Sequence, residues 1–199
     1  VTIQSPPDTP ALSSAGNSSY VGTNVTLTSS AAPNGGTYTW YKNGTIDATL
    51  TTQSIILSTA AQSGSYTVTV TDANGSTSQA TADVLYLPVH NTTANTYHST
   101  IQSGVDAASA GDVLDVCSGT FTEQVEVNKN LTINGQGTGS TIVASPTTLT
   151  KFFTTSANNY PVIYGHDAAD IRIQNLTVDG LGNGATAGYR FLGIGYNNA

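Results

Sequence analysis

The chain has 199 residues, of which only 9% are charged, and its 12 acidic and 5 basic residues give a formal net charge of −7. This balance excludes the basic surface stripe that neutralises phosphates, so we expect no nucleic-acid partner. The single cysteine, Cys117, excludes an intramolecular disulfide and a Cys/His zinc site built around it. No apolar run reaches the roughly 18–20 residues of a membrane span.

Serine and threonine make up about a quarter of the chain, far above their ordinary share. Solubility therefore rests on hydroxyl and amide groups, a composition that is common in extracellular β proteins. The chain begins at Val1 without a methionine or an apolar signal segment, which is typical of a mature or trimmed product. We expect a secreted or cell-surface protein.

Residues 1–15 are expected to form a tail or a donor or edge strand, because their prolines remove backbone donors. From 16 to 88, apolar and polar residues alternate in short runs. Turn signals such as Asn43-Gly44 separate these runs. The pattern predicts an antiparallel β-sandwich.

Two aromatic residues specify this sandwich further. Trp40 lies in one predicted strand, and Tyr66 lies two residues before Val68 in another. This arrangement resembles the immunoglobulin-like domain, in which a strand C tryptophan packs in the core and a tyrosine corner precedes a cysteine. Leu27 and Val68 stand where that family has its cysteine pair. The resemblance implies that Trp40 and Tyr66 are core residues.

Residues 89–99 are polar and predict a linker. Residues 100–110 predict a helix with Thr100 as its N-cap and with apolar residues on one face. The stretch 101–137 resembles the N-terminal cap and first coils of pectin-lyase-like β-helices. The resemblance implies that residues 100–199 form a short right-handed parallel β-helix capped by the helix at 100–110. The expected fold class is therefore all-β.

A repeated motif supports the solenoid. The tripeptide Asn-Leu-Thr occurs at 130–132 and again at 175–177. Two coils of about 22 residues would span that distance, a typical repeat for a solenoid. The inward-facing core residues are then expected to be Leu131, Ile133, Leu176 and Val178.

The C-terminal part of the sequence shows no second capping helix after about four expected coils. An uncovered solenoid end presents unpaired backbone groups to neighbouring strands. Three coverings are open: a later part of a longer β-helix, another copy or another protein, or residues 191–196 folding back over the last coil.

Enzymes of the pectin-lyase-like class act on acidic polysaccharides through clustered carboxylates, with a basic residue in the lyases. The best candidate cluster consists of Asp167, Asp170, Arg172 and Asp179. Asp170 and Arg172 share a strand face, which is more simply interpreted as a surface ion pair. Asp179 is interpreted as a turn residue that bonds its own backbone. We therefore assign no catalytic residue.

The remaining reactive side chains do not form a recognisable site. His90, His98 and His166 are scattered, so no metal site or cofactor is expected. Cys117 has no histidine at a spacing that would activate it and is interpreted as a partly buried structural thiol.

Seven Asn-x-Ser/Thr sequons are candidate glycosylation sites. In the predicted strands and turns, most of these asparagines point outward to solvent. They are Asn17, Asn24, Asn43, Asn74, Asn91, Asn130 and Asn175.

These patterns favour a non-enzymatic extracellular structural protein, a glycosylated surface or filament subunit that assembles with copies of itself, head to tail, through exposed β edges. One alternative is a carbohydrate-binding adhesin that uses Tyr160, Tyr164 or Tyr189. Another is a fragment of a polysaccharide lyase or esterase with catalytic coils beyond residue 199.

Overall fold

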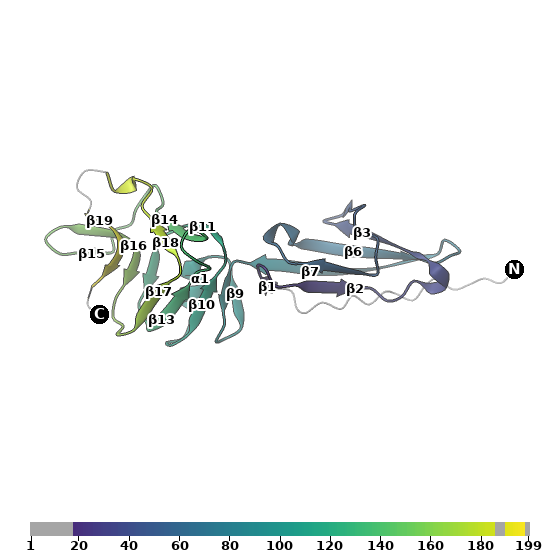
Figure 1. Cartoon of the computed structure of the whole chain (residues 1–199), viewed down its shortest axis with the longest axis horizontal. Coiled ribbons are helices and arrows are strands. Elements are labelled where there is room, and N and C mark those ends of the chain that lie inside the picture. Colours follow the sequence, from purple (N-terminus) through teal and green to yellow (C-terminus); the bar gives the residue numbers. More distant parts are fainter. Residues whose placement is uncertain (1–17, 186–189, 198–199) are drawn as a thin grey trace. The chain divides into compact units, whose positions relative to one another are not determined.

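The computed structural model describes residues 18–185 and 190–197, and the predicted tail at 1–15 lies outside them. The predicted all-β class is confirmed: strands dominate the described chain, with one short α-helix. The chain divides into two compact units, Val1–Leu87 and Pro88–Ala199 (Figure 1).

The first unit is a sandwich of two sheets. A five-stranded sheet has the order β1 (Ser18–Tyr20), β7 (Thr77–Leu87), β6 (Gly64–Thr71), β3 (Thr37–Lys42) and β4 (Thr45–Ile46). Strand β1 pairs in parallel with β7, and the other pairs are antiparallel. The second sheet consists of β2 (Val25–Thr28) and β5 (Ser54–Leu57) in antiparallel pairing. Two short 3₁₀ helices, Pro33–Gly35 and Ala60–Gln62, lie in the connections.

The two sheets enclose one apolar core. Trp40 and Tyr66, both predicted as core residues, are buried there. The Trp40 indole Nε1 donates to the Thr52 carbonyl at 2.8 Å, and the Tyr66 hydroxyl donates to the Gln62 carbonyl at 2.8 Å. Each polar atom of these buried aromatic side chains therefore has a partner, as burial requires.

The second unit is a parallel β-helix. Its first coil contains β10 (Val113–Val116), β11 (Gly119–Thr122) and β12 (Val125–Val127). The second contains β13 (Leu131–Asn134), β14 (Thr141–Ala144) and β16 (Asn158–Gly165). The third contains β17 (Ile171–Gln174), β18 (Thr177–Asp179) and β19 (Arg190–Tyr196). Equivalent strands of successive coils pair in parallel, so each side of the solenoid is a continuous sheet (Figure 1).

The predicted coil repeat is wrong in its spacing. One coil of 40 residues, rather than two coils of about 22, separates Leu131 from its stacking partner Ile171. An insertion between β14 and β16, which includes β15 (Phe153–Thr154), enlarges this coil. The second Asn-Leu-Thr motif leads into β18, on a different side of the solenoid from β13. The described residues thus form three coils and not four, since a two-residue alternation does not identify which sheet a strand joins.

The predicted linker at 89–99 is instead a β-hairpin. Strands β8 (Val89–Asn91) and β9 (Thr96–His98) pair with each other, and β8 pairs with β10. Val89 and Asn91 are both buried, so this segment extends the first sheet of the β-helix. Its polar composition concealed this role, because an added edge hairpin buries only alternate residues.

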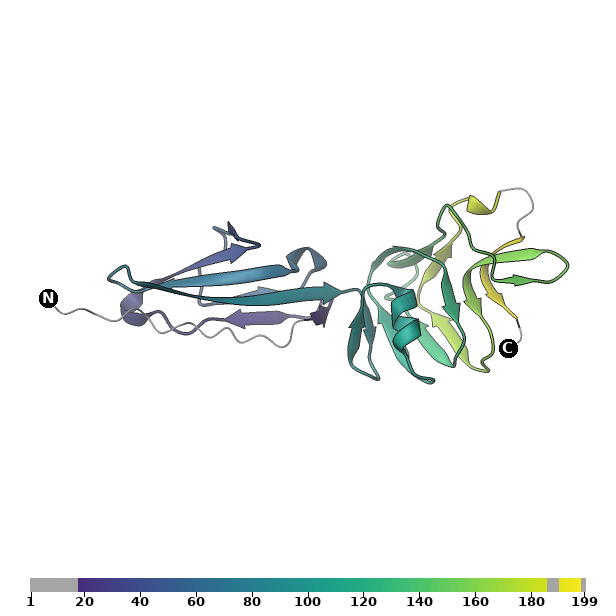
Figure 2. The same ribbon diagram turned by 180° about the vertical axis from the view of Figure 1, so that it is seen from behind.

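Helix α1 (Ile101–Ala107) lies against the first coil (Figure 2) and ends three residues before the predicted boundary. Thr100 is the N-cap, as predicted, and its Oγ1 accepts from the Ser103 amide at 3.0 Å. The coil holds both helix ends: the Glu123 carboxylate accepts from the first two helical amides at 3.0 and 2.9 Å. Lys129 Nζ donates to the carbonyls of Val105 and Ala108, both at 3.1 Å. These contacts match the partial charges of the helix ends.

Replacing Glu123 with alanine is expected to lower the free energy of unfolding of the β-helix unit by about 1–2 kcal/mol, because two helix amides lose their acceptor. Urea unfolding followed by circular dichroism measures this loss. The neighbouring exposed Thr122→Ala serves as the matched control and should change stability by less than about 0.5 kcal/mol. Equal stability of the Glu123 variant and the wild type would contradict this role.

No helix in the described part of the chain is long and apolar enough to cross a membrane.

Candidate functional site

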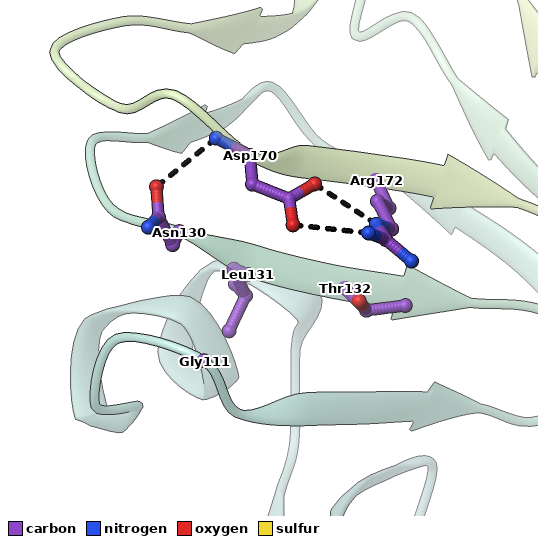
Figure 3. A pocket seen from close by; sticks show the side chains of 6 residues that line it. All are labelled: Gly111, Asn130, Leu131, Thr132, Asp170 and Arg172. Atoms are coloured by element: carbon purple, nitrogen blue, oxygen red, sulfur yellow. Dashed lines mark hydrogen bonds and ion pairs between the residues drawn. The ribbon is translucent and has the colours of Figure 1, made fainter.

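A polar cleft lies on the sheet formed by β10, β13 and β17 (Figure 3). Its volume is about 260 Å³. It is lined by Gly111, Asn130, Leu131, Thr132, Asp170 and Arg172. The stacking of β17 on β13 brings the Asp170 amide to Asn130 Oδ1, at 3.1 Å, and so links two coils at the edge of the cleft.

As predicted, Asp170 and Arg172 form a surface ion pair. Arg172 Nε lies 2.9 Å from one Asp170 carboxylate oxygen, and a terminal guanidinium nitrogen lies 3.1 Å from the other. The two side chains are 55% and 64% exposed. The hydrogen bond from Arg172 lowers the pKa of Asp170, and the same bond raises the pKa of Arg172. A general base needs a carboxylate oxygen that can reach the proton of a substrate, whereas both oxygens of Asp170 accept from the guanidinium.

The structure does not bring the rest of the predicted carboxylate cluster to this cleft. Asp179 ends β18, on another sheet, and its Oδ1 accepts from the Leu181 amide at 2.9 Å. This is the predicted turn interaction. Asp167 has a left-handed backbone with φ of 51° and bonds to His166. The four residues therefore form an ion pair, a turn contact of Asp179 and a side-chain contact of Asp167 with His166, rather than one catalytic group.

A second polar cluster surrounds His166, and sequence reasoning missed it. His166 Nε2 lies 2.9 Å from Glu126 Oε1, and Nδ1 lies 2.7 Å from Asp167 Oδ2. The imidazole stacks on Tyr164 with ring centroids 4.6 Å apart. Glu126 pairs in register with Tyr164 on the adjacent coil. Only this register brings Glu126 to His166, so no spacing in the sequence could have revealed the contact.

The tyrosines proposed as a carbohydrate platform are not an open row of rings. Tyr164 is buried, and Phe152 and Phe153 stack against it with centroids 5.1 and 5.0 Å away. Tyr160 is half-buried, and Tyr189 lies outside the described residues. A sugar ring needs an exposed aromatic face for stacking, which Tyr164 does not offer.

The other reactive side chains have structural contacts. Cys117 is buried, its thiol donates to the Ser118 carbonyl at 3.3 Å, and burial raises its pKa. His90 stacks on Tyr97, with centroids 4.6 Å apart, and the His98 ring bonds to the Thr96 hydroxyl at 3.0 Å. Among the described residues, no group of three or more His, Cys, Asp or Glu side chains has the arrangement of a metal site.

Five predicted glycosylation asparagines are exposed, namely Asn24, Asn43, Asn74, Asn130 and Asn175. Asn17 lies outside the described residues. The structure contradicts the prediction for Asn91, which is 1% exposed and whose Nδ2 donates to Asp112 at 2.7 Å. Its Oδ1 accepts from the amides of Thr93 and Ala94 at 3.1 and 3.0 Å, so the oxygen holds the β8–β9 turn while the nitrogen bonds to Asp112.

The third coil presents an incompletely covered apolar surface, which we call the third-coil face: Ile171, Ile173, Leu176, Val178 and Ile194. In register, Ile133 stacks on Ile173 and Ile163 stacks on Ile194. Ile133 and Ile163 are 0% exposed, whereas Ile173 is half-buried and Ile194 is 41% exposed. Among the described residues, β17, β18 and β19 each pair with a neighbour on one side only.

Comparison with known proteins gives partial matches. The model of the Penicillin-Binding Protein C-terminus Family matches residues 1–82, which is less than half of the chain. No curated protein matches the chain. Among solved structures, the chain is similar to a Yersinia enterocolitica family 28 exopolygalacturonase, with 14% sequence identity and a TM-score of 0.32. That likeness covers 85% of this chain and only 40% of the enzyme, and it assigns no activity here.

Proposed function

We propose that the chain is a non-enzymatic extracellular structural protein, a glycan-bearing surface or filament subunit that assembles head to tail with copies of itself. The third-coil face of one copy would contact exposed β edges of the next. Repeated heterologous contacts of this kind build open polymers when the rotation between subunits does not close a ring.

The exposure of the third-coil face carries this proposal. Along each stack of inward residues, burial is complete in the second coil and falls sharply in the third. Half-exposed isoleucines beside unpaired strand edges favour association, since both the apolar surface and the backbone groups gain partners. A parallel β-helix is extended by adding strands of the same direction, which a further chain can supply.

The sandwich unit offers surfaces that could receive this face. Ile46 on the edge strand β4 is 58% exposed, and Ile56 on β5 is 63% exposed. Both strands pair on one side only among the described residues. The strand order, the buried Trp40 and the tyrosine-corner bond of Tyr66 support an immunoglobulin-like assignment for this unit. That assignment and the hydroxyl-rich composition both agree with a location outside the cell.

The enzymatic and adhesin alternatives find less support in the geometry. Asp170 is engaged by Arg172, Cys117 is a buried thiol with a raised pKa, and the buried Tyr164 ring stacks with Phe153 and His166. These three side chains thus have structural partners that account for their positions.

Sedimentation velocity over a range of concentrations tests the proposal. We expect the average mass of the wild type to rise with concentration, and the Ile173→Lys/Ile194→Lys variant to remain a monomer, because two buried charges at a contact are costly. Ile46→Lys/Ile56→Lys should weaken assembly in the same way. Asn128→Lys/Thr122→Lys, which adds the same charge at exposed positions of the first coil, should assemble like the wild type.

Two outcomes would contradict the proposal. One is a wild type that stays monomeric at all concentrations while circular dichroism shows that it is folded. The other is a native polypeptide, identified by its intact mass, in which later strands of the same chain cover the third-coil face.

A further inference from the structure

Two identical tripeptides stand in different environments on the β-helix. Asn130-Leu131-Thr132 enters β13 and Asn175-Leu176-Thr177 enters β18. Both asparagines are exposed. An N-linked glycan is attached to the side-chain nitrogen Nδ2, so a hydrogen bond donated by this atom must break before a folded sequon can react.

Nδ2 of Asn130 is available. The Asn130 side chain bonds through Oδ1, which accepts from the Asp170 amide at 3.1 Å. In Figure 3 this oxygen faces Asp170 and the nitrogen points to the other side. Among the described residues, no hydrogen bond engages Nδ2 of Asn130. A glycan on this nitrogen would leave the contact between the coils intact.

Nδ2 of Asn175 is engaged. It donates to Asn134 Oδ1 at 2.8 Å, and Asn134 Nδ2 in turn donates to Asp115 at 2.8 Å, so the asparagine belongs to a row of side-chain bonds that crosses three coils. Asn175 also has a left-handed backbone, with φ of 56°, at the corner between β17 and β18. Presenting Nδ2 to an enzyme requires this corner to open first.

We propose that Asn130 is a glycan acceptor in the folded protein and that Asn175, in the same tripeptide, is not. In the reaction, a bond forms between Nδ2 and C1 of the sugar while the bond between C1 and the oxygen of a lipid-linked diphosphate donor breaks. The lipid diphosphate leaves with the electron pair of that bond, and the one proton that Nδ2 loses passes to solvent water. This inference deepens the proposed function, since it rests on an extracellular protein that meets such a donor.

The same criterion, whether Nδ2 donates a hydrogen bond, distinguishes two further sequons. Asn43 bonds through its oxygen to the Ser65 amide at 2.9 Å, which leaves Nδ2 for a glycan at the exposed β3–β4 turn. Asn91 is excluded because its Nδ2 is buried against Asp112.

The test uses the purified folded chain, a lipid-linked oligosaccharide and a single-subunit oligosaccharyltransferase that accepts Asn-x-Ser/Thr. Glycopeptide mass spectrometry follows the rate at each site. We expect Asn130 to be modified at least about tenfold faster than Asn175 in the folded chain, because Asn175 must wait for local opening. In the urea-unfolded chain, transferred into the assay by rapid dilution, the two identical tripeptides should react at similar rates.

Two matched variants test whether the hydrogen bond to Asn134 is what slows modification of Asn175. Asn134→Ala removes the acceptor of Asn175 Nδ2 and should raise modification at Asn175 without changing Asn130. Gln174→Ala removes a different bond to the same Asn134 oxygen and should leave Asn175 slow. Equal rates at both sites in the folded chain, or an unchanged Asn175 in Asn134→Ala, would overturn the inference. This assay uses purified protein, so its result does not depend on where the protein is located in the cell. The proposed surface location is tested separately, because it would be contradicted if a membrane-impermeant reagent did not label the protein on intact cells.

Discussion

Replacing Ile133 with alanine is expected to lower the free energy of unfolding of the β-helix unit by about 4 kcal/mol. Ile133 is fully buried in the second coil, where its side chain packs between Leu114 of the first coil and Ile173 of the third. Neighbouring coils are joined by strand pairing and have little freedom to collapse into the cavity. Urea unfolding followed by far-ultraviolet circular dichroism measures the loss. Fluorescence of Trp40, the one tryptophan, reports the sandwich unit and should keep its midpoint.

Ile173→Ala is the matched control in the same stack. Its side chain is half-buried, so at low protein concentration the loss should be only about 1 kcal/mol. If the third-coil face is covered by another copy, this loss grows with protein concentration, because association stabilises the folded state. Equal losses for Ile133 and Ile173 in dilute solution would show that the third coil is already covered within the monomer.

The second large effect concerns the β8–β9 hairpin. Asn91→Ala is expected to destabilise the β-helix unit by about 3 kcal/mol, because Asp112 and the amides of Thr93 and Ala94 lose their partner in a buried setting. Thermal unfolding of Asn91→Ala and of Asn24→Ala, an exposed sequon asparagine, gives the comparison. A small loss for Asn91, similar to that for Asn24, would contradict the structural role assigned to it.

Asp112, the hydrogen-bond partner of Asn91, is expected to make the stability of this hairpin depend on pH in the acidic range. The bond from Asn91, the Ser109 amide and the charge of Lys129 together lower the pKa of Asp112. A carboxylate with a lowered pKa stabilises the fold above its unfolded pKa of about 3.9, and this contribution is lost as the pH falls through the folded value. The difference in melting temperature between the wild type and Asp112→Asn should therefore be largest near neutral pH and shrink below about pH 4. A constant difference from pH 7 to pH 2.5 would contradict this assignment.

Local patterns predicted the elements better than their assembly. Alternation located the strands around Trp40 and Tyr66, and the apolar face with Thr100 before it located α1, because these signals act over a few residues. The stacking of Leu131 on Ile171 depends on the length of an irregular insertion, which no alternation encodes. The Asn91 amide was misassigned for a related reason: a sequon has the same letters whether its nitrogen is free or buried.

The contacts of the candidate site likewise divide into local ones, which the sequence predicted, and long-range ones, which it did not. The Asp170–Arg172 pair and the turn bond of Asp179 follow from residues two apart, so the sequence sufficed to predict them. The contact of His166 with Glu126, and that of Asn175 with Asn134, each join residues about 40 positions apart. Such contacts become visible only when the register between coils is known.

Hydrogen–deuterium exchange of the purified chain at low and high concentration tests the central claim most directly, because it locates the contact within the sequence. Our account predicts that backbone amides of β17, β18 and β19 become protected as concentration rises, while those of β10, β11 and β12 keep their protection. In the Ile173→Lys/Ile194→Lys variant, the third coil should exchange at the dilute rate at every concentration. Exchange of the third coil that does not depend on concentration in the wild type would contradict assembly through this face.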